Sequence, residues 1–391
     1  VGLPLLPQHL SREEYLRRVA QQALETLEGT SVCPSLLIEP TACQLSEANP
    51  RNLPVHAVLF EWFPHFTNEF YSLAVDAFSS DLDHSGKPRR LVVAAHESWL
   101  TEDGRWRRGL WWTGLEDDLL IESDIEPSLS PLCVQTICAP PEAHSRIHDW
   151  CVRHSISQVN PYPISAVADD KYECFLRWKE SGVPTPETRL IQRGTPKQKT
   201  ESLLAEWISQ TARDNPDCCR DTALFIQPNL GTEGRDVCVY TVPSGFQDAV
   251  QRITAMAVTE PVIVRPSCGN IYWRDDSSGA IISCVLRVNV GFDGTEHRAE
   301  SGYLQVASSP GESVVSAGRG GHVVEFRKGA LESLVTAEGK SVVLDAESIR
   351  TLKMIAANAA QTIGGVGLFG VDLRLEVTAS PQAPRSSMLL S

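Results

Sequence analysis

Three apolar runs, each of strand length, lie in the first part of the chain: VHAVLF at 55–60, LVVAA at 91–95 and LCVQTI at 132–137. The segments between them are long enough to hold helices, and such alternation is typical of an α/β domain with a parallel sheet. A helical pattern also opens the chain, where Ser11 and Glu14 have capping-box spacing. These patterns predict a first domain of α/β type.

The remaining chain alternates between helical and strand patterns. Asp169 or Asp170 can cap a helix that Gly182 and Pro184 end, and a long apolar helical stripe follows Asp345. Strands are predicted in four further segments: 222–240, where two strands flank a glycine-bearing loop, 261–266, 281–290 and 369–377. No fixed-period repeat accompanies these elements.

Composition and charge narrow the class of protein. The chain has 391 residues, of which 42% are hydrophobic, so we expect two or three globular domains rather than disorder. No apolar run approaches the ~18–20 residues of a membrane-spanning helix. The formal net charge of −14 argues against nucleic acid or an anionic membrane as the main partner.

Cysteine usage and the chain ends bear on location. The 11 cysteines form no CxxC motif, which favours reduced thiols over a disulfide framework. No secretory signal pattern precedes the first domain, so we expect a cytoplasmic protein. Because the sequence starts without Met and stops within an apolar stretch, we interpret it as an incomplete chain.

Two strands and one loop carry candidate chemistry. In the loop at 227–237, Gly231 and Gly234 would let the backbone fold over a phosphate, although an ordinary turn would need the same glycines. Arg287 lies in an apolar strand and needs either a structural carboxylate or a bound anion. Asp372 lies on a strand face that could bind Mg²⁺, although taken alone the pattern favours a solvated face on which Arg374 neutralises its neighbours.

Three other patterns are set aside. GVGLFG at 365–370 follows a helix and precedes a strand, the reverse of the order in a dinucleotide-binding fingerprint. GRWRRGLWW at 104–112 is interpreted as a surface hairpin or loop because acidic residues follow it. His144 and His148 have helical spacing but no evident third metal ligand.

Five segments, taken in order, resemble the ATP-grasp superfamily. Residues 160–188 resemble the segment in which an Asn/Asp-Lys helix precedes a P-x-T loop, and 225–240 resemble the lid hairpin KPxxGxxGxGV. PVIVRP at 261–266 resembles the strand that lines the adenine pocket. CVLRVNVGFDG at 284–294 resembles the DxRxxVxxG strand, and GVDLRLE at 370–376 the G-x-D strand near the metal.

The resemblance covers roughly residues 158–377 and implies an α/β chain with an ATP-grasp fold. Two α+β lobes would clasp ATP, preceded by a Rossmann-like pre-ATP-grasp domain. The implied domains are the N-terminal α/β domain at 1–165, the first ATP-grasp helix and small lid lobe at 166–263, and the C-terminal lobe with its metal site at 264–391. ATP and Mg²⁺ are the implied cofactors.

The resemblance also implies roles for individual residues. Arg287 matches the catalytic arginine that stabilises a transferred phosphoryl group, and Asp372 and Glu376 are the implied metal ligands. The implied nucleotide-binding residues are Lys171, Gln227, Gly231, Thr232, Glu233, Gly234, Arg265 and Asn289.

This chain departs from the family pattern at three places. Gln227 stands where the lid strand usually carries Lys, which removes one cation, and Arg265 falls near a hinge position that is often acidic. The C-terminal ExN metal pair is not recognisable, and Glu376 follows Asp372 more closely than that pair usually does. RSSMLLS, which ends the sequence, resembles the start of a following strand, so we expect the pair just beyond Ser391.

The function implied is an ATP-dependent ligase. It would join a carboxylate to an amine through an acyl phosphate. Within the superfamily, the divergence of this chain resembles that of amino-acid or dipeptide ligases of secondary metabolism. A degenerate nucleotide-binding protein and a phosphotransferase on the same fold are the alternatives. We expect small-molecule carboxylate and amine substrates, no nucleic-acid or membrane partner, and leave open whether the chain forms a homodimer.

Overall fold

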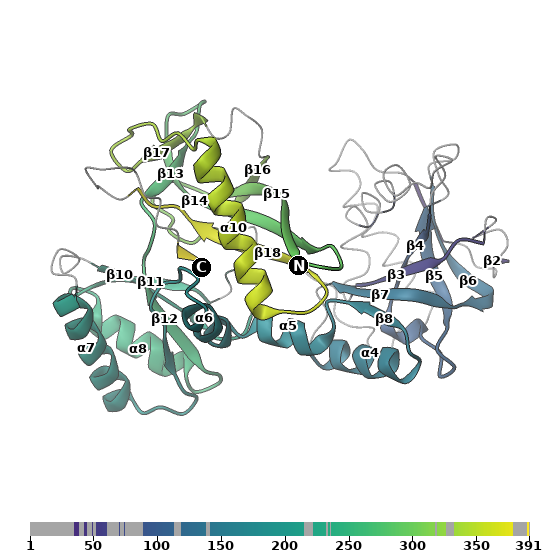
Figure 1. Cartoon of the computed structure of the whole chain (residues 1–391). Helices are drawn as coiled ribbons and strands as arrows, with labels where there is room; N and C mark the ends of the chain where they lie inside the picture. Colours follow the sequence, from purple (N-terminus) through teal and green to yellow (C-terminus); the bar gives the residue numbers. More distant parts are fainter. Residues whose placement is uncertain are drawn as a thin grey trace. The chain divides into compact units, whose positions relative to one another are not determined.

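The structure is a computed structural model of the chain. It describes residues 35–38, 43–44, 49, 52–60, 70, 74, 89–112, 119–137, 141–214, 222–231, 234, 236–316, 319–325, 332–377 and 389–390. The chain divides into two compact units, Val1–Tyr162 and Pro163–Ser391 (Figure 1). The helix predicted near Ser11 lies outside the described residues. Within the described ranges, no helix is long and apolar enough to cross a membrane.

The first unit is built on one large mixed sheet. Its strands are β1 (Ser35–Ile38), β2 (Cys43–Gln44), β3 (Val55–Phe60), β4 (Leu91–Ala95), β5 (Trp106–Trp112), β6 (Leu119–Leu129), β7 (Pro131–Ile137) and β8 (Ser157–Val159). They follow the order β1-β6-β5-β4-β3-β7-β8, with β2 beside β6. Strand β3 pairs in parallel with β4 and β7, so the three predicted strands and their parallel pairing are confirmed. Helices η1 (Glu97–Trp99) and α4 (Pro141–Arg153) complete the unit.

The interpretation of 104–112 as a surface loop is wrong. Strand β5 lies inside the sheet, antiparallel to both β4 and β6, and the Trp106 side chain is fully buried. Arg108, 4% exposed, donates from Nε to Glu122 Oε1 at 2.8 Å and from Nη1 to Asp124 Oδ1 at 3.1 Å. A buried charge is tolerated when a partner neutralises it, and β6 provides two carboxylates.

The second unit contains a four-stranded antiparallel sheet with the order β11-β10-β12-β9. Its strands are β9 (Arg189–Ile191), β10 (Thr222–Pro228), β11 (Cys238–Val242) and β12 (Val262–Pro266). Helices α7 (Lys197–Asp214) and α8 (Phe246–Met256) pack on one face of this sheet, where Leu204 and Ile253 join Leu224 and Val264 in one apolar core. Alternation therefore leaves Phe225, Gln227 and Arg265 on the opposite face.

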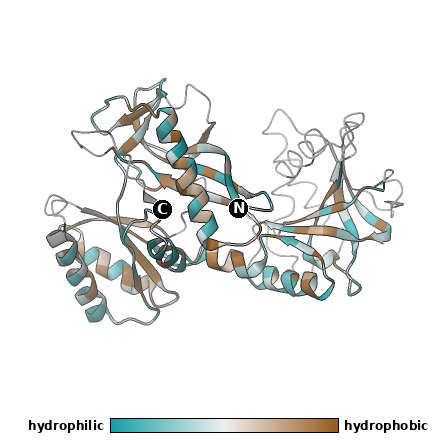
Figure 2. Ribbon diagram, viewed as in Figure 1, coloured by the Kyte–Doolittle hydropathy of each residue, from teal (hydrophilic) through white to brown (hydrophobic). Residues whose placement is uncertain are grey.

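A second, larger sheet follows in the same unit, in the order β16-β15-β14-β13-β17, with β18 beside β14 and β19 beside β18. Its strands are β13 (Ile271–Arg274), β14 (Ile281–Phe292), β15 (His297–Val306), β16 (His322–Glu325), β17 (Leu334–Thr336), β18 (Leu368–Arg374) and β19 (Leu389–Leu390). Helix α10 (Ala346–Ile363) packs its apolar stripe, including Leu352, Ala356 and Ala359, against this sheet. Figure 2 shows the alternating hydrophobic and hydrophilic bands of this helix.

Helix ends in this unit follow their sequence signals. Asp170 caps α6 (Lys171–Glu180), which follows α5 (Tyr162–Asp169), and Asp345 caps α10. Gly364 ends α10 with a φ of 87°, a conformation that glycine adopts without a steric penalty. In α6, Cys174 and Phe175 are buried, whereas Leu176 is 43% exposed. The second unit contains two sheets, each with helices packed against it, and this mixed α/β fold confirms the predicted fold class.

Candidate functional site

The first residue of α6 reaches the glycine-bearing loop that follows β10. Lys171 Nζ donates to the carbonyl oxygens of Asn229, at 3.2 Å, and Gly231, at 2.6 Å. The fold thus joins segments 60 residues apart in the chain. Burial, and then the positive charge of the nearby Arg265, lower the pKa of Lys171 to about 8. The ammonium is therefore a cation beside the loop at neutral pH.

Asn229 holds this junction together and was not identified from the sequence. Its Oδ1 accepts from the backbone N–H of Tyr172 at 2.9 Å, and its Nδ2 donates to Asp170 Oδ1 at 2.9 Å. Asn229 is buried, so these bonds replace the water that its amide would otherwise need. The signal in the sequence was the turn-type Pro-Asn-Leu-Gly stretch, because Asn side chains often bond to nearby backbone.

The two glycines of the loop have positive φ angles, which other residues rarely adopt. Gly231 has a φ of 118° and Gly234 a φ of 66°. A Cβ on Gly234 would lie 2.9 Å from Ser316 Cβ, so only glycine allows this close approach. Arg319 donates from Nε to Gly234 O at 3.1 Å and from Nη2 to Val237 O at 2.6 Å. Thr232 and Glu233, also predicted to bind nucleotide, lie outside the described residues.

Arg265 lies on the sheet face opposite to α7 and α8, close to Lys171 and Cys174 of α6. It pairs directly with Phe225 across β10 and β12, so the two side chains share a face, and Gln227 is the next residue of β10 on that face. Arg265 is only 8% exposed, and its Nε has no hydrogen-bond partner among the described residues. Burial lowers the pKa of its guanidinium to about 10. It remains charged at neutral pH.

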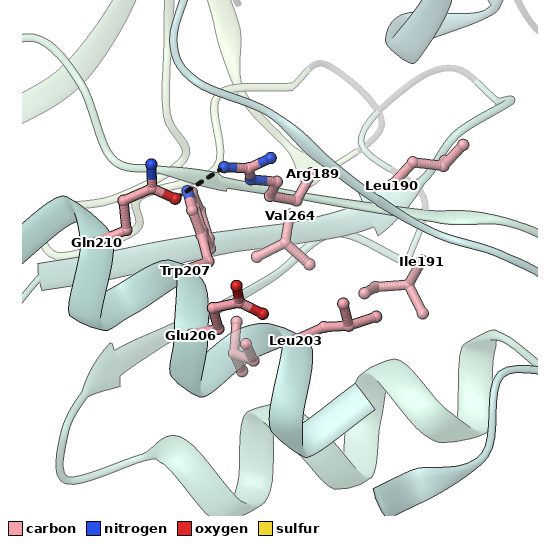
Figure 3. Close-up of a pocket in the computed structure, with 9 residues that line it drawn as sticks. Arg189, Leu190, Ile191, Leu203, Glu206, Trp207, Gln210 and Val264 are labelled. Atoms are coloured by element: carbon pink, nitrogen blue, oxygen red, sulfur yellow. Dashed lines mark hydrogen bonds between the residues drawn. The ribbon is translucent and has the colours of Figure 1, made fainter. Parts of the chain in front are cut away.

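A pocket opens on the other face of this sheet (Figure 3). It lies between β9 and α7, with Val264 of β12 in its wall and a hydrogen bond of 3.5 Å from Arg189 Nη2 to Gln210 Oε1 at one side. None of the predicted site residues lines it. The pocket is therefore separate from the candidate site.

Arg287 and Asp372 meet across two strands of the larger sheet. They are register partners in β14 and β18, and Arg287 donates from Nε to Oδ1 at 2.6 Å and from Nη2 to Oδ2 at 2.7 Å. Hydrogen bonding to Asp372 raises the pKa of Arg287 above its already high value, and Tyr303, opposite on β15, adds to it. Gly370 makes room, because a Cβ there would lie 3.2 Å from Arg287 Cδ. The chain itself provides the carboxylate that Arg287 requires.

Other predicted residues of this sheet have local partners. Asn289 Nδ2 donates to Ser301 Oγ at 3.0 Å. Arg374, between Asp372 and Glu376 in the sequence, donates to the carbonyl oxygens of Cys284 and Ser313 at 3.2 and 3.0 Å. Glu376 lies two residues beyond Arg374, the last residue of β18.

The described residues alone do not form a complete Mg²⁺ site. Both carboxylate oxygens of Asp372 accept from Arg287, and nowhere in the described ranges do three His, Cys, Asp or Glu side chains gather as a metal site would require. The interpretation of the last residues as a further strand is confirmed for Leu389–Leu390, which pair with β18. Asp372 and Glu376 remain predictions as metal ligands.

Known proteins were compared with the chain by sequence and by structure. No protein-family model matches it, and no curated protein sequence does. Solved structures match over most of the chain. D-alanyl-alanine synthetase A from Vibrio cholerae is 14% identical, with 87% of each chain covered and a TM-score of 0.47. The VanG D-Ala:D-Ser ligase from Enterococcus faecalis is 13% identical, with coverage of 87% and 89% and a TM-score of 0.48.

A third solved structure, the D-cycloserine synthetase DcsG, is 15% identical, with coverage of 86% and 91% and a TM-score of 0.45. At these identities and TM-scores, the neighbours do not establish what this chain binds or catalyses, so its chemistry has to be argued from its own residues.

Proposed function

We propose that this chain is an ATP-dependent ligase that joins a carboxylate to an amine. The observation that carries the proposal is the contact of Lys171 Nζ with the carbonyl oxygens of Asn229 and Gly231. It places an ammonium group beside a glycine-bearing loop, and an ammonium group binds phosphate oxygens through charge-assisted hydrogen bonds. Arg265 adds a second positive charge close to Lys171. The two positive charges are suited to the phosphate groups of a nucleoside triphosphate.

In the proposed reaction, a carboxylate oxygen of one substrate attacks the γ-phosphorus of ATP, and ADP leaves. The amine of the second substrate then attacks the acyl carbon of the acyl phosphate, phosphate leaves, and the nitrogen loses a proton to solvent. Both steps move negative charge, so catalysis depends mainly on fixed cations. We assign that task to Arg287, which Asp372 and Tyr303 hold in a defined orientation.

The direct test measures the products formed from ATP with pairs of carboxylate and amine substrates, beginning with amino acids. We expect ADP and phosphate in equal amounts, only when both substrates are present. Lys171→Met, which keeps the length of the side chain, should weaken ATP binding at least ten-fold. AMP and pyrophosphate as products would contradict the acyl-phosphate route, and a stable phosphorylated product would identify a phosphotransferase.

A second candidate function is nucleotide binding without catalysis. The observation that favours it is the ion pair between Arg287 and Asp372, in which the two residues assigned to chemistry satisfy each other. Gln227 in place of a lysine points the same way. ATP binding by calorimetry, together with no ADP release over a broad substrate panel, would favour this candidate over the ligase.

A further inference from the structure

Arg265 is a buried cation without a described counter-charge. It is 8% exposed, and its buried Nε has no hydrogen-bond partner among the described residues. Arg108 in the first unit and Arg287 in the larger sheet each have a carboxylate partner. Burying an unpaired charge is costly, so its presence points to a partner that joins the folded chain from outside.

The groups close to Arg265 cannot neutralise it. The thiols of Cys174 and Cys268 lie near its guanidinium, but burial raises the pKa of Cys174 to about 12 and raises that of Cys268 as well. Both thiols are therefore protonated at neutral pH. The other neighbour is Lys171, whose own charge repels that of Arg265. Asp169 and Asp170 lie near Lys171 and offset its charge, whereas the charged groups near Arg265 include no carboxylate, so Arg265 is the cation left to attract an anion.

The register of the sheet connects Arg265 with Gln227. Arg265 is directly opposite Phe225, so it lies diagonally across from Gln227 on the same face. Diagonal neighbours in antiparallel strands are about 7–8 Å apart, which is within reach of a long side chain. A guanidinium at position 265 can therefore serve the same anion as a lysine at position 227 would.

We propose that Arg265 binds a phosphate group of the nucleotide and replaces the positive charge that Gln227 lacks. This inference rests on the proposed nucleotide site. The planar guanidinium presents several N–H donors in a fixed geometry and matches phosphate oxygens well. Because the residue is nearly desolvated, its bonds to phosphate are stronger than those of an exposed lysine.

Arg265→Met tests the proposal, since methionine keeps the apolar stem and removes the charge. Binding of MgATP and of adenosine is measured by calorimetry, and Tm is measured without nucleotide. We expect MgATP to bind at least ten-fold more weakly and adenosine to bind equally well. The Tm should be unchanged or higher, because a buried unpaired cation has been removed. A structural arginine would have the opposite effect on Tm.

The matched control is Arg189→Met. Arg189 pairs with Val264 across β9 and β12, so it lies on the opposite face of the same sheet, beside the pocket of Figure 3, and its side chain is 45% exposed. We expect its MgATP affinity to equal that of the wild type. Equal losses in the two variants would show a general effect on the sheet and would overturn the role of Arg265.

The decisive variant moves the charge. In Arg265→Met/Gln227→Lys, we expect most of the lost MgATP affinity to return, because the cation reaches the same phosphate from the neighbouring strand. Wild-type affinity in Arg265→Met, a variant that fails to fold, or no recovery in the double variant would each overturn the proposal. Failure of the wild type to bind MgATP would instead overturn the nucleotide site itself.

Discussion

Two arginines of the second unit lie on inner strands of two different sheets, and their surroundings differ. Arg287 on β14 is paired through two hydrogen bonds with Asp372. Arg265 on β12 is more deeply buried and has no partner among the described residues. The pKa of the guanidinium is raised in the first case by the carboxylate and lowered in the second by burial.

The difference separates two uses of one side chain. A paired arginine stabilises the folded chain and is held in a fixed orientation by its carboxylate. An unpaired buried arginine destabilises the folded chain until an anion binds. The free energy gained when the anion pairs with the arginine then contributes to the affinity for the ligand. The two arginines should therefore respond in opposite ways when each is removed, and the following variants test that contrast.

The largest effect is expected for Arg287→Ala. If Arg287 stabilises the transferred phosphoryl group as proposed, its removal should lower kcat by about 10²-fold with little change in ATP affinity. It should also lower the free energy of unfolding by about 1–2 kcal/mol, since a charged hydrogen-bonded pair is lost at a partly exposed site. Steady-state kinetics and chemical denaturation measure the two effects.

Arg298→Ala is the control for Arg287→Ala. Arg298 pairs with Asp293 and Glu296, but its side chain is 61% exposed, so its loss should leave the free energy of unfolding nearly unchanged. An Arg287→Ala enzyme with normal kcat and reduced stability would leave Arg287 with a structural role only.

The next effect is the pH dependence of ATP binding. The pKa of Lys171 is lowered to about 8 in the folded chain, so its charge is present below that pH and is lost as the pH rises through 8. ATP affinity should fall by about ten-fold between pH 7 and pH 9.5, and the fall should disappear in Lys171→Met. Calorimetry at constant ionic strength separates the titration of Lys171 from the screening of charges by salt. An equally steep fall in Lys171→Met would assign it to another group.

A smaller effect is expected for Gln227→Lys in the otherwise unchanged chain. With Arg265 already present, a second cation on the same face should tighten ATP binding by only about two- to five-fold, because both would compete for the same phosphate oxygens. Thermal melts with and without MgATP measure the change. If the variant melts well below the wild type, the Gln227 side chain is packed in an apolar region rather than facing the nucleotide.

The smallest effect concerns the loop that Gly231 begins. Arg319→Ala removes two hydrogen bonds to the backbone of Gly234 and Val237, so the loop should open more often. We expect faster limited proteolysis between β10 and β11 and a two- to three-fold rise in KM for ATP, with global stability within about 0.5 kcal/mol of wild type. Unchanged proteolysis would show that the loop is held by other contacts.

Helices α6 and α10 and several strands of the second unit could be predicted because their signals are local. Helical spacing of apolar residues and the caps Asp170 and Asp345 identify α6 and α10, and the alternation around Arg287 and Asp372 identifies β14 and β18. These signals depend only on neighbours a few residues away. Strand β5 was missed because Arg107 and Arg108 hide an otherwise apolar run.

Local sequence specifies which residue types are available and on which face of a helix or strand each one lies. Which of these residues meet depends on how distant segments pack. Arg287 and Asp372 are 85 residues apart, and only the register of β14 against β18 pairs them, whereas no described strand brings a carboxylate to Arg265. The reason is physical: periodicity follows from local backbone geometry, but pairing depends on register and packing between distant segments.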